Sequence, residues 1–260
     1  MDPSRLIISS EQQFKKILEG FFLTVYNESL LPSHGIDHHR RVWRYAVELL
    51  NLPGNTPEDS RLTDSLIIAS YLHDAGMAYE PGPRHGWKSA ELCRRFLELN
   101  NLDEKDFPGL LNTIIEHDNK DYPEENNDNL LKLLSLADDL DAFGFAGIYR
   151  YLEIYFHRGI EPLTVAGMIR TNAAGRFRNF SRCVPGNIPF FINHEKRFII
   201  LDEFFKACQA MEPGYAEVVE KIRQITTSGQ GPQFFISLHD DNPVMTWFKE
   251  GLIKEMGYQQ

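Results

Sequence analysis

The sequence contains few cysteines. Only three occur in 260 residues, and the positions Cys93, Cys183 and Cys208 are widely separated with no CxxC pair. An odd and scattered set of this kind excludes a disulfide framework, which favours a reducing compartment. We therefore expect a cytoplasmic protein whose core needs no covalent cross-links, since a chain of this length can bury a sizeable core.

Long apolar runs are also missing. No stretch approaches the length of a membrane span, and residues 1–5 lack the basic segment and following apolar run of a signal peptide. Basic charge is scarce, because 27 Lys and Arg stand against 37 Asp and Glu, for a formal net charge of −10. We therefore expect no membrane partner and no broad surface for duplex nucleic acid.

Strand patterns are few, whereas apolar side chains recur at helical spacing along most of the chain. Leu62, Leu66 and Ala69 lie at i, i+4 and i+7, and His73 follows on the same stripe. The one strand-like patch is at 234–236. The periodicity predicts helices over about 10–31, 37–50, 62–73, 88–99, 107–117, 129–142, 145–156, 162–171, 196–210, 215–226 and 243–256. Without repeats or a linker, residues 1–260 read as a single all-α domain.

Polar side chains occur on or beside these apolar stripes at several places. His73-Asp74 closes one helix, and the others are His38, His117, Asp138 and, in a loop, His85. Leaving so many buried polar groups unpaired would cost several kcal/mol, at about 1–3 kcal/mol for each. Imidazole nitrogens and carboxylate oxygens both suit a divalent transition metal, and a shared ion would satisfy all of them.

Two neighbouring pairs leave a choice. His38 and His39 each lie on an apolar stripe, so periodicity alone cannot choose between them. Asp138 lies beside the apolar stripe of its helix and is the expected inward carboxylate. Asp139 aligns with Lys132 and Ser135, and we expect it to face solvent.

The order of these residues resembles the H…HD…D signature of the HD-domain metal-dependent phosphohydrolases. His38 precedes Arg41-Val42, His73-Asp74 ends an apolar run, and Asp138 lies in an Ala-Asp-Asp-Leu-Asp-Ala segment. The resemblance covers about 20–160, which it identifies as an HD core, and leaves a C-terminal helical extension at about 161–260. It implies the HD-domain helical bundle, and it selects His38 over His39.

Two further stretches resemble family members that hold two metals. They are His85-Gly86-Trp87-Lys88-Ser89-Ala90 and the helix end at His117. The resemblance implies one or two divalent ions (Mn, Fe, Co, Ni or Zn). One ion would be held by His38, His73, Asp74 and Asp138. The second would be held by Asp74 as a bridge, His85 and His117.

The resemblance also implies metal-activated water that attacks a phosphate ester, with Asp74 as the catalytic residue that holds the nucleophile. The expected substrate is a nucleotide or a related small phosphorylated molecule. Residues near the motif are candidates to bind its phosphate, although each could instead form a structural contact: His34, Arg41, Arg84 and Lys88. The basic run from Arg170 to Arg178, followed by Arg182, could close over a polyanionic substrate or pack against acidic groups, and we expect the packing.

Alternatives remain at this point. The Lys that follows His-Asp in cyclic dinucleotide phosphodiesterases is absent from His73-Asp74-Ala75-Gly76-Met77, which argues against cyclic di-GMP as the substrate. The same ligands could hold two irons in an HD-fold oxygenase, and a non-catalytic ligand-binding HD domain is the third alternative. The sequence leaves open the metal, the exact substrate and whether the chain forms a homo-oligomer.

Overall fold

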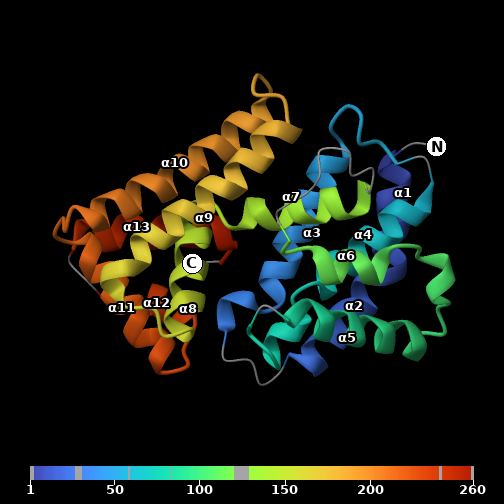
Figure 1. Ribbon diagram of the computed structural model, residues 1–260, viewed down its shortest axis with the longest axis horizontal. Helices are drawn as coiled ribbons and strands as arrows, with labels where there is room; N and C mark the ends of the chain where they lie inside the picture. Colours follow the sequence, from blue (N-terminus) through green and yellow to red (C-terminus); the bar gives the residue numbers. More distant parts are fainter. Residues whose placement is uncertain are drawn as a thin grey trace. The chain divides into compact units, whose positions relative to one another are not determined.

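The computed structural model describes residues 3–26, 31–57, 59–82, 84–119, 129–239 and 242–258. Every regular element in these ranges is a helix, which confirms the all-α prediction (Figure 1). None of the described helices is long and apolar enough to cross a membrane. The chain forms two compact units, unit 1 from 1–30 and 34–138 and unit 2 from 31–33 and 139–260. Their boundary precedes the expected start of the extension.

Unit 1 is built around one central helix, α4. It contacts helices on several sides and buries Leu66, Ile67, Ala69 and Tyr71 completely. Because α4 is surrounded, the residues that end it, His73 and Asp74, reach the middle of the unit. The helices of unit 1 are α1 (Pro3–Ser10), α2 (Lys16–Val25), α3 (Ile36–Leu50), α4 (Ser60–Leu72), α5 (His85–Leu99), α6 (Leu110–Glu116) and most of α7 (Asn129–Asp141).

Short helical turns lie between these helices, and one of them, Pro32–His34, belongs mostly to unit 2. A π-helical turn, Glu11–Lys15, joins α1 to α2, and 3-10 turns occupy Pro32–His34, Ala75–Ala78 and Glu104–Asp106. Helical structure therefore begins at Pro3, earlier than the predicted start near residue 10. The predicted end near residue 31 depends in part on 27–30, which lie outside the described residues.

Local chemistry fixes both ends of α4. Asp59 caps its start by accepting a hydrogen bond from the Arg61 amide at 3.0 Å. After its end, the Gly76 amide donates to Ser89 Oγ at 2.9 Å, and a Cβ on Gly76 would lie 2.7 Å from the Ser89 amide nitrogen. A glycine is required there because the backbones approach so closely. This approach holds the end of α4 beside the start of α5.

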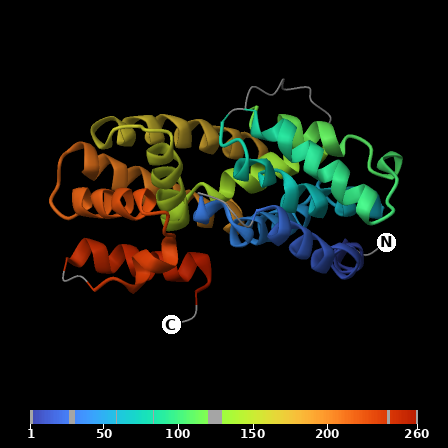
Figure 2. The same ribbon diagram turned by 90° about the horizontal axis from the view of Figure 1, so that it is seen from below.

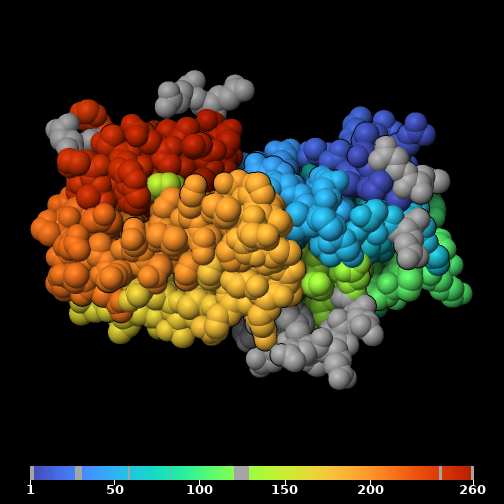
Figure 3. Space-filling view, turned by 90° about the horizontal axis from the view of Figure 1, so that it is seen from above, coloured from blue at the N-terminus to red at the C-terminus, as the bar shows by residue number. Residues whose placement is uncertain are grey.

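Unit 2 is centred on α8, which contacts α9, α10, α11 and α13 (Figure 2). Large aromatic side chains fill its core, including Tyr149, Phe204, Phe235 and Phe248. The helices α10 to α13 make up much of its surface on the side drawn in Figure 3. The bounds are α8 (Gly144–His157), α9 (Pro162–Cys183), α10 (Pro189–Gln209), α11 (Tyr215–Thr227), α12 (Pro232–Ser237) and α13 (Pro243–Met256).

Two local predictions were wrong. Residues 234–236 form part of helix α12 rather than a strand, because Phe235 packs edge-on against Tyr149 and Phe248 at ring-centroid distances of 5.9 and 5.5 Å. Asp139 does not face solvent. It is 1% exposed, and its Oδ1 lies 2.7 Å from the Arg176 guanidinium.

The basic run lies on α9, which extends further than predicted. Arg170 pairs with Asp202 at 2.8 Å, and Arg176 pairs with Asp139. These two arginines therefore contact acidic groups of their own unit, in agreement with the expectation from sequence.

Candidate metal centre

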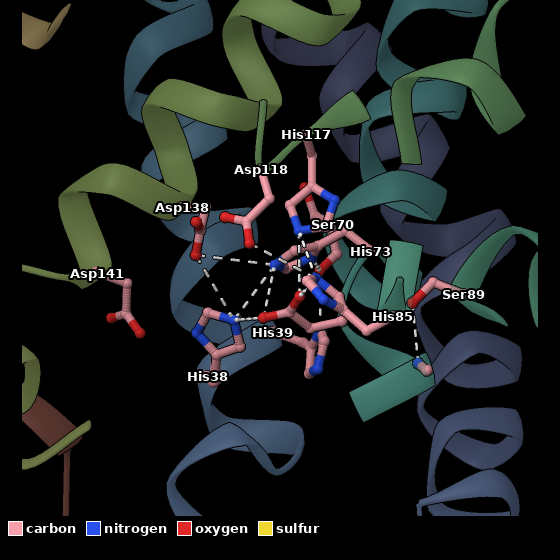
Figure 4. A network of polar contacts seen from close by, with 12 residues as sticks. His38, His39, Ser70, His73, His85, Ser89, His117, Asp118, Asp138 and Asp141 are labelled. Atoms are coloured by element: carbon pink, nitrogen blue, oxygen red, sulfur yellow. Dashed lines mark hydrogen bonds and ion pairs between the residues drawn. The ribbon is translucent and has the colours of Figure 1, made fainter. Parts of the chain in front are cut away.

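Five helices of unit 1 bring six predicted residues to one place. His38 lies in the first turns of α3, and His73 with Asp74 ends α4. His85 begins α5, and His117 ends α6. Asp138 lies on α7. All six side chains are buried. Those of His38, His73, His85, His117 and Asp138 are seen to converge in Figure 4.

The six residues divide into two groups that share Asp74. The first ligand group comprises His38, His73, Asp74 and Asp138, and the second comprises Asp74, His85 and His117. Within each group the candidate ligand atoms all lie within 4.8 Å of one another.

Asp74 turns one oxygen toward each group. Its Oδ1 lies 3.1 Å from both His85 Nε2 and His117 Nε2. Its Oδ2 lies 3.5 Å from His38 Nε2 and 3.6 Å from His73 Nε2. The carboxylate therefore stands between two pairs of imidazoles, in the position of a bridge.

Three of the imidazoles are oriented by backbone carbonyl groups. The Nδ1 atoms of His73, His85 and His117 lie 3.1, 2.8 and 2.7 Å from the carbonyl oxygens of the residues three positions earlier. A carbonyl oxygen can only accept, so each Nδ1 carries a hydrogen and donates it. In the neutral ring the lone pair is then on Nε2, which is the nitrogen that faces the cluster.

The distances fit shared divalent ions. Two atoms that each lie about 2.1 Å from one ion are at most about 4.2 Å apart. His38 Nε2 lies 3.3 Å from His73 Nε2 and 3.9 Å from Asp138 Oδ1. His85 Nε2 and His117 Nε2 are 3.3 Å apart. Neutral imidazoles whose lone pairs face each other this closely are unfavourable unless a cation or proton lies between them, so the donor set suits a metal.

Burial and the neighbouring side chains shift the pKa values of Asp74 and His85. Burial opposes ionisation of Asp74, yet His73 and hydrogen bonds from the other imidazoles hold its pKa well below the usual range. Burial also disfavours a charged His85, but the Asp74 carboxylate outweighs it and raises the pKa of His85 to about 9. A carboxylate that stays ionised in the interior is the group expected beside a buried cation.

The four predicted phosphate-binding residues occupy different surroundings. His34 and Arg41 are buried, and the His34 ring lies 5.7 Å from that of His38. Arg84 is exposed and pairs with Glu80 at 2.9 Å. Lys88 pairs with Glu91 at 2.8 Å and lies over the Tyr79 ring. His34 thus lies next to a ligand candidate, whereas Arg84 and Lys88 each form an ion pair with a carboxylate close by in the sequence.

Two residues outside the predicted ligand set lie beside the cluster: His39, which the sequence left as an alternative to His38, and Asp118, which was not among the predicted residues. His39 is fully buried, and its Nδ1 lies 3.0 Å from the carbonyl oxygen of Ser70, which His73 also uses. Burial lowers the pKa of His39 well below its usual value, so the ring is neutral. Asp118 Oδ2 lies 3.9 Å from His85 Nε2. The sequence feature that could have indicated both residues is their position, because each directly follows a predicted ligand in the chain.

Comparison with known families identifies the same region. The HD-CE family matches residues 20–182, which is more than half of the chain and includes all six clustered residues. Comparisons with curated proteins and with solved structures gave no match. The extent of the family match shows that the chain belongs to the HD-CE family.

Proposed function

We propose that this protein is a metal-dependent phosphohydrolase that cleaves a phosphate ester of a nucleotide or a related small molecule. The observation that carries the proposal is the position of Asp74, whose two oxygens face two separate pairs of imidazole Nε2 atoms. A complete and buried donor set of this kind favours an enzyme over a ligand-binding domain that has lost its metal.

The first ligand group would hold one divalent ion, and the second would hold another through Asp74, His85 and His117. Bound divalent ions polarise phosphoryl oxygens and lower the pKa of a coordinated water to near neutrality. Asp74 is placed between the two positions, so its carboxylate would fix their separation and orient the attacking water. The Nδ1 hydrogen bonds of His73, His85 and His117 hold the rings so that no reorganisation is needed.

Four side chains are proposed to bind the substrate. Arg84 directly precedes His85, and its side chain is 78% exposed, so it can exchange Glu80 for a phosphate. Lys88 lies one helical turn further on α5, and His34 and Arg41 flank His38 along the chain. Arg84→Gln should raise KM with kcat retained, because a group that binds substrate and transition state equally changes KM alone. A fall in kcat with unchanged KM would contradict that role.

The test is metal content combined with phosphate release. The purified protein should contain divalent metal by elemental analysis and release phosphate from some members of a nucleotide panel, equally with and without oxygen. Asp74→Asn should abolish turnover while the helical circular dichroism spectrum is retained. Asp106→Asn, an exposed aspartate of the same unit, is the matched control and should behave as wild type.

The alternatives give different results. Iron together with oxygen consumption and no phosphate release would replace the hydrolase with an oxygenase. Retained turnover in metal-loaded Asp74→Asn would contradict the assignment of the site. A protein that takes up no metal, even after addition of Mn or Fe, and shows no turnover would instead be a binding module.

A further inference from the structure

Asp118 lies beside the second ligand group but belongs to none of the predicted sets. It follows His117 at the end of α6, and its carboxylate points into the cluster (Figure 4). Its Oδ2 lies 3.9 Å from His85 Nε2. Its side chain is 46% exposed, whereas that of Asp74 is 9% exposed. Asp118 therefore occupies the side of the second group that solvent reaches.

The distance between Asp118 and His85 can be compared with the carboxylate–imidazole distances in the first ligand group. Asp138 Oδ1 lies 3.9 Å from His38 Nε2 and 3.8 Å from His73 Nε2. Asp118 thus stands as far from an imidazole of the second group as Asp138 stands from those of the first. Asp138 also belongs to a set of atoms that all lie within 4.8 Å of one another, whereas Asp118 is not part of such a set with Asp74, His85 and His117. Asp118 therefore stands beside the second ligand group, next to His85, rather than within it.

The two groups differ in charge without Asp118. The first group contains two carboxylates, Asp74 and Asp138, and the second contains only the shared Asp74 with two imidazoles, which carry no charge when they act as metal ligands. A divalent ion held mainly by neutral nitrogens keeps most of its charge uncompensated in a buried site, which is unfavourable. A carboxylate beside His85 would reduce this difference in charge between the two groups, and Asp118 lies beside His85.

We propose that Asp118 is a supporting carboxylate of the second metal position, which acts through its charge next to His85 and from outside the ligand group. Its carboxylate lies 3.9 Å from His85 Nε2, and its negative charge tightens the binding of the divalent ion that Asp74, His85 and His117 hold. This inference rests on the proposed metal-dependent function, but it concerns affinity for the ion rather than turnover. Each position then has two imidazoles and the charge of two carboxylates, with Asp74 common to both and Asp118 outside the ligand group.

The experiment is a titration of the full-length, metal-stripped protein with Mn²⁺, followed by isothermal calorimetry and by electron paramagnetic resonance of unbound Mn²⁺. The wild type should bind two ions. Asp118→Asn should weaken the second ion by about 10- to 100-fold, the range found for groups that support metal ligands, and leave the first unchanged. Asp118→Glu retains the charge and should bind the second ion more tightly than Asp118→Asn. Asp106→Asn is the matched control.

Asp118→Ser provides a second neutral variant in case Asp118→Asn fails to fold, and circular dichroism checks both. Two ions bound with wild-type affinities by a folded neutral variant would overturn the role of Asp118 while the metal centre itself stands. A wild-type protein that binds no Mn²⁺ would overturn both proposals. Equal weakening of both ions would also contradict the assignment of Asp118 to the second position.

Discussion

Asp138 and Asp139 are adjacent on α7, but Asp138 faces the imidazoles of the first ligand group and Asp139 forms a buried ion pair. Substitutions at the two positions should therefore have different effects. Asp138 Oδ1 lies 3.9 Å from His38 Nε2 and 3.8 Å from His73 Nε2, separations that suit ligands of one shared ion. Asp139 Oδ1 accepts a hydrogen bond from Arg176 at 2.7 Å, and its side chain is 1% exposed. Asp138→Asn should therefore change metal binding, whereas Asp139→Asn should change the stability of the fold.

The size of the second effect follows from the burial of the pair. Removing one partner of a buried salt bridge costs about 3–5 kcal/mol. The Arg176 side chain retains 16% exposure, and an asparagine oxygen at position 139 can still accept from it, so the expected cost is lower. A loss of about 2–3 kcal/mol is reasonable for Asp139→Asn, starting from that range. It corresponds to a fall in the thermal unfolding midpoint of roughly 5–10 °C for a chain of this size.

The assay compares both variants with wild type after removal of metal and again after loading with Mn²⁺. Asp139→Asn should unfold at lower temperature yet bind the same number of ions. Asp138→Asn should keep the midpoint of the metal-stripped protein within roughly 3 °C and lose or weaken one ion. If Asp139→Asn lost an ion while Asp138→Asn lost only stability, the assignment of the two carboxylates would be reversed.

Three further predictions follow from single positions. Gly76→Ala should cost about 1–3 kcal/mol and loosen an ion at His85, because its Cβ would meet the backbone of Ser89; unchanged unfolding would refute the close approach. Ion binding should release a proton from His85 at pH 7 and weaken as pH falls below about 9, since only the neutral ring is a ligand. Calorimetry in buffers of different ionisation enthalpy measures the number of protons released. Binding heats that do not depend on the buffer would contradict the prediction. Iodoacetamide should label the exposed Cys183 in native protein and spare Cys93, whose pKa burial raises; rapid labelling of Cys93, read by mass spectrometry, would show that its site opens.

Most helices were predictable because their stabilising contacts repeat at a fixed interval along the sequence. The stripe of Leu66 and Ala69 is buried in the structure, as its spacing predicts. The failures have contacts that no local window contains. Asp139 is buried because of Arg176, a residue 37 positions away. Phe235 is helical because Tyr149 and Phe248 pack against it, despite a local preference for strand.

Hydrophobic periodicity could not identify which of two adjacent histidines belongs to the first ligand group. His38 and His39 are 1% and 0% exposed, so both faces of α3 that carry them are buried. Hydrophobic periodicity distinguishes buried from exposed positions, so it cannot choose between two buried histidines. The structure distinguishes them by direction, because His39 turns Nδ1 to the Ser70 carbonyl and His38 turns Nε2 toward Asp74. The resemblance to the HD-domain family supplied the choice that hydrophobic spacing could not.

The ends of helices explain why the predicted imidazoles can serve as ligands. The last four carbonyl groups of a helix have no partner within it. His73 and His117 are the C-cap residues of α4 and α6, and each donates its Nδ1 hydrogen to a carbonyl of the last turn, at Ser70 and Ile114. One hydrogen bond thus satisfies a helix end and leaves the lone pair of the same ring on Nε2. The C-terminal end of a helix also carries partial negative charge, which favours a cation nearby. A histidine placed directly after an apolar helix therefore gains its orientation from the helix itself, and Asp74, one residue later, supplies the charge that a divalent ion requires.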